Sequence, residues 1–318
     1  MTDQANQPLL FVGCDVGKEE IVVCDSRTGR LLTLANKAKA LATWAATLPA
    51  GCLVVCEATG GYEAALLAAL CAAGVAVHRA DARKVKAFIR SFGILGKTDA
   101  LDARALARYA AERHAQLARW RAPEETRRKL HALVSARRDL VAERTACANR
   151  LKAPGAEVCA PYFSALAECL ETQIRALDAD IAALIASDGK LAQTVEIVQS
   201  VPGIGAPTAA ALVALMPELG ALSGKKVAAL AGLAPHPKQS GKMDAYRHVR
   251  GGRPEIKRVL FMAALSAATR AKAFKDFYQR LIQNGKKPLV AVIAVMRKML
   301  VIANARLRDA KLYQEHAI

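Results

Sequence analysis

Two aspartates, Asp99 and Asp102, stand three residues apart at the start of KTDALDARALARY, a segment with the composition of a helix. Residues three apart share a helix face, so the two carboxylates lie side by side and repel each other. A cation bound between them removes that repulsion. The spacing therefore makes this pair a candidate set of metal ligands.

Two further acids end apolar, strand-like runs: Asp15 follows FVGC, and Glu57 ends CLVVCE just before the turn signal Thr59–Gly61. If the first and fourth strands are neighbours in one sheet, both acids emerge close together. A helix packed across that edge would add Asp99 and Asp102. Four clustered carboxylates require a cation, and Mg²⁺ suits them, with Mn²⁺ as the alternative. Two such ions can clamp the attacking and leaving oxygens of a phosphodiester.

Each acid taken alone has a simpler structural interpretation. A strand-end aspartate is usually a turn or cap residue, and Asp99 is itself a candidate helix cap. The four acids together, in a basic chain with the element order described next, favour the metal site.

The first third of the chain alternates between short apolar runs and helical segments. Strands are expected at LLFVGCDV, KEEIVVCDS, GRLLTLAN, CLVVCEATG and VAVHRAD, and helices at KALATWAATL, YEAALLAALCAAG, RKVKAFIRSFG and DALDARALARYAAERH. The order β-β-β-α-β-α-β-α predicts a mixed sheet that begins as an antiparallel meander and is covered by helices.

The middle of the chain is long, charged and helical. Its second helix places apolar residues at coiled-coil steps of three and four: Leu166, Leu170, Ile174, Leu177, Ile181 and Leu184. The pattern fits a dimerising helical hairpin and, almost equally, a helix pair that packs on its own domain. We therefore expect an α/β domain at residues 1–118, a coiled-coil hairpin at 119–190 and a mainly helical domain at 191–318.

The last third contains apolar helical segments around one polar loop, HPKQSGKMDAYRHVRGGR. The turn Pro202–Gly205 resembles a helix-hairpin-helix turn, whose glycine amides bind a DNA backbone. A plain turn between two helices is about as good an interpretation of this short motif.

The composition indicates a polyanionic partner. The chain has 318 residues, a formal net charge of +18 and a pI near 9.8. Nucleic acid is the leading candidate and an anionic membrane surface the alternative. No uninterrupted apolar run reaches about 18 residues, and the first ten residues lack the pattern of a secretory signal, so we expect a cytoplasmic protein without a membrane span. The eight cysteines form no CxxC pair and read as reduced, buried thiols, not as a zinc site.

Positive charge is concentrated between residues 225 and 258, a segment that contains nine basic residues and two acidic ones. Interleaved glycine and serine favour close phosphate contact, although a solvated charged face is the usual meaning of such a run. The candidate nucleic-acid contacts are Lys238, Lys242, Arg247, Arg250, Arg253, Lys257 and Arg258.

Several motifs together resemble one family. GCDVGK, CEATGGYE and KTDALDA look like the metal-binding motifs of insertion-sequence transposases with a RuvC-like, ribonuclease H-fold domain carrying Asp-Glu-Asp-Asp. VPGIG, KKVAALAGLAP, QSGK and GGRPEIKRVLFMAA extend the resemblance into the C-terminal domain, so it covers almost the whole chain.

The resemblance implies a DNA recombinase guided by a bridge RNA that pairs with target and donor DNA. It implies metal binding by Asp15, Glu57, Asp99 and Asp102, and it makes Ser240 of QSGK the nucleophile that forms a phosphoserine link to DNA. The family assembles as a tetramer, with the two halves of an active site in different subunits, so a homo-oligomer is expected here. Without the resemblance, Ser240 is an ordinary loop serine.

Three other functions remain open at this stage. A nuclease resembling a Holliday-junction resolvase would use the same acids with water as nucleophile. A non-catalytic nucleic-acid-binding protein would retain only the fold, although the presence of all four acids argues against lost activity. An actin-like sugar kinase shares the strand order but needs a second phosphate loop that the sequence lacks.

Overall fold

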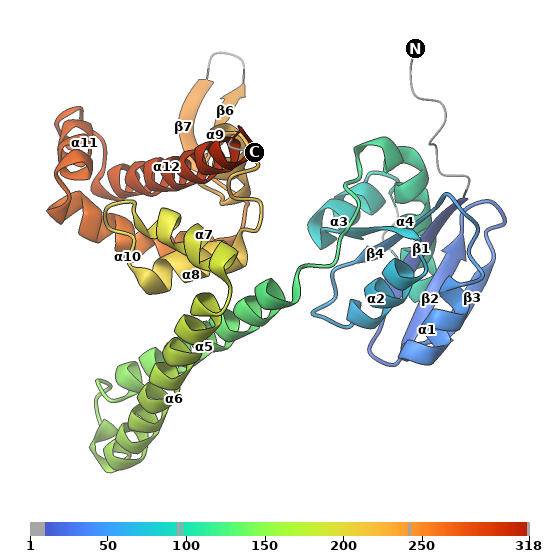
Figure 1. Ribbon diagram of the computed structural model, residues 1–318, viewed down its shortest axis with the longest axis horizontal. Helices are drawn as coiled ribbons and strands as arrows, with labels where there is room; N and C mark the ends of the chain where they lie inside the picture. Colours follow the sequence, from blue (N-terminus) through green and yellow to red (C-terminus); the bar gives the residue numbers. More distant parts are fainter. Residues whose placement is uncertain (1–9, 94–95, 97, 241–242, 317–318) are drawn as a thin grey trace. The chain divides into compact units, whose positions relative to one another are not determined.

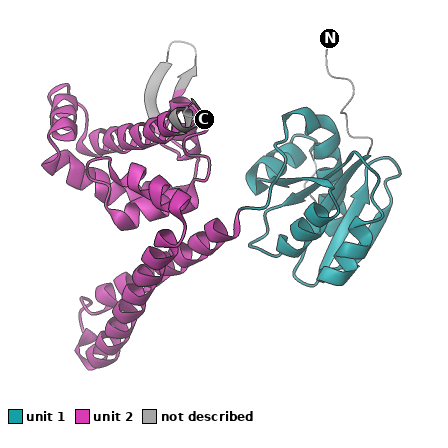
Figure 2. Ribbon diagram, viewed as in Figure 1, with its two compact units in different colours: residues 1–123 teal, residues 124–318 magenta. Residues whose placement is uncertain are grey.

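The structure of the chain is a computed structural model that describes residues 10–93, 96, 98–240 and 243–316, with the side chains of residues 238–247 and 311–316 outside the description. Two compact units divide it, residues 1–123 and residues 124–318 (Figure 2). Each unit has its own hydrophobic core.

The first unit is built on one mixed sheet. Its strands are β1 (Leu10–Val16), β2 (Glu20–Asp25), β3 (Leu31–Ala35), β4 (Cys52–Glu57) and β5 (Ala76–Ala80). They lie in the order β3-β2-β1-β4-β5, with β1 to β3 antiparallel and with β4 parallel to both β1 and β5. The predicted mixed sheet and its opening meander are confirmed, and β1 and β4 are neighbours.

Helices cover both faces of this sheet (Figure 1). On one face, α1 (Ala38–Ala45) and α2 (Ala64–Ala72) bury Leu41 and Leu66 against alternate strand residues such as Val54. On the other face, α3 (Ala82–Arg90) and α4 (Asp99–Arg113) bury Phe88 and Leu106 against Val55. The strand residues alternate between the two cores because successive side chains point to opposite faces.

Helix α4 approaches β1 unusually closely. A Cβ atom placed on Gly13 would overlap the carbonyl oxygen of Ala103 and the amide nitrogen of Ala107, both backbone atoms of α4. Only glycine fits there, because every other residue carries a Cβ atom. On the facing side of α4, Ala103 and Ala107 have side chains of a single methyl group. The contact therefore fixes the height of α4 above the sheet.

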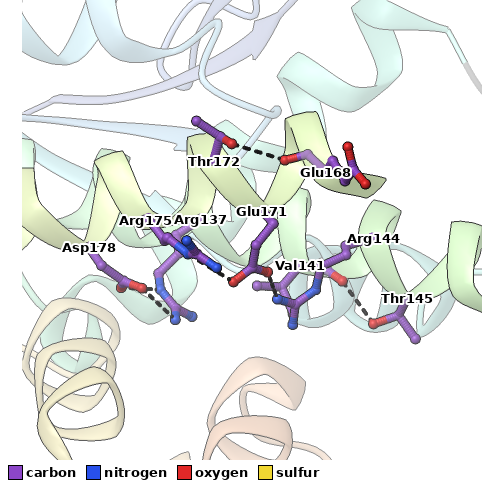
Figure 3. Close-up of polar contacts among 9 residues, drawn as sticks. All are labelled: Arg137, Val141, Arg144, Thr145, Glu168, Glu171, Thr172, Arg175 and Asp178. Carbon is purple, nitrogen blue, oxygen red and sulfur yellow. Dashed lines mark hydrogen bonds and ion pairs between the residues drawn. The ribbon is translucent and has the colours of Figure 1, made fainter. Parts of the chain in front are cut away.

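In the second unit, α5 (Glu125–Arg150) and α6 (Ala160–Ala186) form a helical hairpin, joined through a short turn, η3 (Ala156–Val158). Ion pairs join the two helices: Arg137 binds Asp178 through both carboxylate oxygens, and Arg144 pairs with Glu171 (Figure 3). At the end of the hairpin where α5 begins and α6 ends, Leu130 and Ile181 are buried in the core of the C-terminal helices. The hairpin is thus a paired set of helices that packs on its own unit, as the second interpretation expected. A dimer formed through it stays a prediction.

The remaining helices surround one core. They are α7 (Gly189–Gln199), α8 (Ala206–Leu215), α9 (Gly224–Leu230), α10 (Pro254–Arg270), α11 (Lys272–Gln283) and α12 (Pro288–His316). Within the described residues, the segment Pro288–Ala310 of α12 is long and apolar enough to span a membrane by length and composition. Its side chains at Val295, Met299 and Ala303 are fully buried in the core, which accounts for its apolar character.

The prediction of a polar loop in the C-terminal domain is wrong in part. The structure has a two-stranded antiparallel hairpin there, β6 (Pro235–Ser240) and β7 (Met243–Val249). The sequence here lacks the apolar alternation by which strands are recognised, so it does not predict these strands. The expectation of buried thiols also fails at Cys71, Cys159 and Cys169, which are exposed: Cys71 and Cys169 lie on α2 and α6, and Cys159 directly precedes α6.

The contact at Gly13 leads to a first prediction. Gly13→Ala adds one methyl group against the backbone of α4, so we expect a loss of about 1–3 kcal/mol in the free energy of unfolding, the usual cost of overpacking. Chemical denaturation measures this value. The control is Gly189→Ala, because the added Cβ at Gly189 meets only open space; equal stability of Gly13→Ala and the wild type would contradict the close contact.

Candidate active site

The strand register brings Asp15 and Glu57 together at one edge of the sheet. Cys14 pairs with Cys56 in the parallel β1–β4 ladder, and the two acids are the next residues along. Asp15 points to the same face as Gly13, two residues earlier, because strand side chains alternate. That face is the one covered by α4.

All four predicted metal ligands line a single cavity of about 430 Å³: Asp15, Glu57, Asp99 and Asp102. Two acids come from strand ends and two from the first turn of α4, as the sequence-based hypothesis expected.

The start of α4 explains why two aspartates are tolerated there. Thr98 caps the helix, its hydroxyl oxygen accepting from the amide of Leu101 at 3.2 Å, so Asp99 is the first helical residue and not the cap. Asp99 and Asp102 both occupy the first turn, where the positive end of the helix dipole favours negative charge. Asp102 is half-buried and Asp99 is exposed.

The cavity contains charged residues that the sequence did not reveal as site residues. Glu20 adds a fifth carboxylate, and Lys86 and Arg90 of α3 bring two positive charges. The i, i+4 spacing of Lys86 and Arg90 places them on one helix face, which was the available signal. Cations beside a carboxylate cluster are suited to hold a phosphate group next to it.

The donor set fits Mg²⁺ or Mn²⁺ in kind, since it consists of carboxylate oxygens and contains no thiol or imidazole. In the part of the chain that the structure describes, no three Asp, Glu, His or Cys side chains converge closely enough to hold one ion. Binding would require the carboxylates around the cavity to draw closer.

The second predicted part of the site lies on the β6–β7 hairpin of the other unit. Ser240 is the last residue of β6, and its backbone pairs with Met243 across the turn. Lys242 lies outside the described residues, as do the side chains of Lys238, Ser240 and Arg247.

Four of the predicted nucleic-acid contacts are described: Arg250, Arg253, Lys257 and Arg258. Arg250 and Arg258 are exposed. The guanidinium of Arg253 instead donates to both carboxylate oxygens of Glu218, at 2.6 and 2.8 Å, and to the carbonyl of Leu215. Arg253 therefore also has a structural role, linking the end of α8 to the start of α10.

This ion pair changes the acidity of its carboxylate. Burial by itself raises the pKa of Glu218, but hydrogen bonds from Arg253 and from the backbone outweigh it and hold the pKa below its usual value. The charged form is thus preferred in the folded protein.

Known transposases resemble this chain over most of its length. A family described as transposase matches residues 12–154, and the transposase IS116/IS110/IS902 family matches residues 195–279. The pilin gene-inverting proteins of Moraxella lacunata and Moraxella bovis are 32% and 33% identical to this chain, each alignment covering 80% of both proteins. A 42 kDa protein of insertion element IS900 from Mycobacterium paratuberculosis is 27% identical over 96% of this chain and 97% of its own length.

These matches define the class: the protein is a DNA transposase, an enzyme that breaks and rejoins DNA. The chain belongs to the IS116/IS110/IS902 family of transposases.

The Glu218–Arg253 pair leads to a pH-dependent prediction. The pKa of Glu218 is lower in the folded than in the unfolded protein, so its stabilisation is present above the unfolded value and is lost as the pH falls through the folded value. Glu218→Gln should therefore be about 1 kcal/mol less stable than the wild type at pH 7, a modest value because the pair is partly exposed. The difference should shrink as the pH falls below about 4, the ordinary pKa of a glutamate, and through the lower pKa of the folded protein.

Urea denaturation from pH 3 to pH 7 tests this expectation. Glu196→Gln, an exposed glutamate on α7, is the control and should show little change at any pH. A stability difference for Glu218→Gln that does not depend on pH would contradict the assigned ion pair.

Proposed function

We propose that this transposase is an RNA-guided recombinase in which Asp15, Glu57, Asp99 and Asp102 bind Mg²⁺ and Ser240 is the nucleophile. The observation that carries the proposal is the single cavity lined by all four acids. The motif resemblance supplies the roles of Ser240 and of the bridge RNA.

We also assign the first unit to the RuvC-like, ribonuclease H-like folds. Support comes from the sheet order β3-β2-β1-β4-β5, with an antiparallel meander followed by parallel strands. The acids at the ends of β1 and β4 and on the helix crossing β1 fit a nuclease site on such a sheet.

In the proposed reaction, the hydroxyl oxygen of Ser240 attacks the phosphorus of a DNA phosphodiester. A bond forms between serine oxygen and phosphorus, and the bond from phosphorus to the leaving sugar oxygen breaks. The serine proton passes to water, and the leaving sugar oxygen takes a proton from water to become the free hydroxyl end of the broken strand. Bound Mg²⁺ would supply charge neutralisation at the phosphate. Lys86 and Arg90, which line the acidic cavity, would bind the same phosphate in this proposal.

The partners in this proposal are donor DNA, target DNA, a bridge RNA and further copies of the chain. The basic residues from 225 to 258 supply the nucleic-acid surface, with Arg250, Lys257 and Arg258 as its described members. The two relatives named for pilin gene inversion support a reaction that rejoins the strands it breaks. We place the protein in the cytoplasm, where DNA and RNA are both available.

The acidic cavity also supports a second candidate, a metal-dependent endonuclease of the junction-resolving kind. Such an enzyme would use water in place of Ser240 and would need only the first unit's acids. The two candidates differ in whether a covalent link to DNA forms.

A covalent-adduct assay separates them. Wild-type protein is incubated with flanking element DNA, its RNA and Mg²⁺, denatured, and examined for DNA attached to protein. We expect an adduct with the wild type and none with Ser240→Ala or Asp15→Ala. Ser266→Ala, an exposed serine of α10, is the control and should form the adduct normally.

Cleavage without an adduct, undiminished in Ser240→Ala, would replace the recombinase by the endonuclease. Adduct formation by Asp15→Ala at the wild-type rate would remove Asp15 from the metal site.

The metal assignment has its own test in Asp102→Asn. This change keeps the side-chain shape but removes a negative donor from the cavity, so we expect strand cleavage to fall below detection while the circular dichroism spectrum stays that of the wild type. Asp180→Asn on the exposed face of α6 is the matched control. Cleavage by Asp102→Asn at the wild-type rate would contradict the assignment.

A further inference from the structure

Glu63 is a buried carboxylate just behind the acidic cavity. It is 2% exposed, and it is not among the residues that line the cavity. Burying a carboxylate is costly unless it is paired and hydrogen-bonded. Its contacts therefore identify what it holds in place.

Both oxygens of Glu63 bind groups of the protein. Oε2 accepts hydrogen bonds from the backbone amides of Thr59 and Gly61, at 3.1 and 3.0 Å. Oε1 pairs with Arg79 of β5, whose Nε lies 2.8 Å away. Burial by itself raises the pKa of Glu63, but these amides, its own amide and Arg79 together hold the pKa below its usual value.

The amides belong to the loop that follows Glu57. Gly60 and Gly61 both have positive φ, at 67° and 106°, so this loop turns sharply as it leaves β4. The hydroxyl of Thr59 donates to the carbonyl of Glu57 at 3.0 Å. Glu63 thus fixes a loop that is itself hydrogen-bonded to a predicted metal ligand.

Asn36 ties the same loop to the loop after Asp15. Its Nδ2 donates to the carbonyl of Tyr62 at 3.0 Å and to the carbonyl of Gly17 at 2.9 Å. Two carbonyl acceptors require the amide nitrogen of Asn36 to face them, which fixes the orientation of this side chain. The loops that follow the two strand-end acids are therefore joined through one residue.

We propose that Glu63 and Asn36 are positioning residues. They hold the carboxylates of Asp15 and Glu57 at the separation and orientation that metal binding needs. The inference rests on the proposed metal site. Neither residue lines the acidic cavity. Both oxygens of Glu63 are already bound by the protein, and Asn36 joins the two loops through its amide nitrogen, which is a donor and not a metal ligand. Residues that orient ligands in this way commonly change metal affinity by about 10- to 100-fold.

Mn²⁺ titration of the full-length protein, followed by the electron paramagnetic resonance signal of the free ion, tests the inference. Glu63→Gln keeps the side-chain shape but loses the charge that pairs with Arg79, and we expect its Kd for Mn²⁺ to rise by about tenfold or more. Asn36→Ala should raise the Kd in the same direction. Glu112→Gln removes the surface ion pair with Arg108 and should leave the Kd unchanged.

Cleavage rates give a second readout that a general loss of folding would not produce. At saturating Mn²⁺, kcat of Glu63→Gln should return to within about threefold of the wild type, since its ligands are intact and only their placement is loosened. Asp102→Asn should not recover at any Mn²⁺ concentration. Circular dichroism, recorded at the assay temperature, shows whether each variant is folded, and Asn36→Ala carries the test if Glu63→Gln is not.

The outcomes separate the inference from the proposed function. If the wild type and Asp15→Ala bind Mn²⁺ equally or not at all, the proposed metal site is wrong, and the positioning role is lost with it. If Asp15→Ala weakens binding but folded Glu63→Gln and Asn36→Ala match Glu112→Gln, the metal site remains and the positioning role is overturned.

Discussion

Helix α4 rests against strand β1 at backbone distance, and the geometry of the acidic cavity depends on that contact. Gly13 has no Cβ to hold the helix away, and Ala103 and Ala107 of α4 lie directly opposite. The first turn of the helix consequently reaches the ends of β1 and β4, where Asp15 and Glu57 stand. A larger residue at position 13 would lift Asp99 and Asp102 away from the two strand-end acids.

The cavity itself presents an electrostatic problem for an enzyme that acts on DNA. Five carboxylates line it, against Lys86 and Arg90, so an unaccompanied phosphate would be repelled. A bound divalent cation would offset the negative charge of the carboxylates. The phosphate would then contact the cation as well as the side chains of Lys86 and Arg90. In the proposed function the carboxylates and the basic residues are complementary, because the acids would bind metal and the bases would bind the nucleic-acid backbone.

The count of 46 lysines and arginines overstates the number of positive side chains available to nucleic acid. Arg137 and Arg144 are engaged across the α5–α6 hairpin, as Figure 3 shows, and Arg253 is engaged by Glu218. These arginines connect helices and do not simply form a solvated basic face. Composition counts all arginines alike. In the structure, some arginines form ion pairs within the fold and others are exposed to solvent.

The sequence by itself determined the local features: the strands and helices of the first unit, the alternation of strand faces, and the four acids at element ends. These depend on periodicity and on residue type within a few positions. Only the tertiary structure decided that β1 and β4 are neighbours, that Lys86 and Arg90 reach the cavity, and that the polar segment around Ser240 is a hairpin. Each of these follows from packing between residues distant along the chain, and no local pattern encodes which distant segments meet.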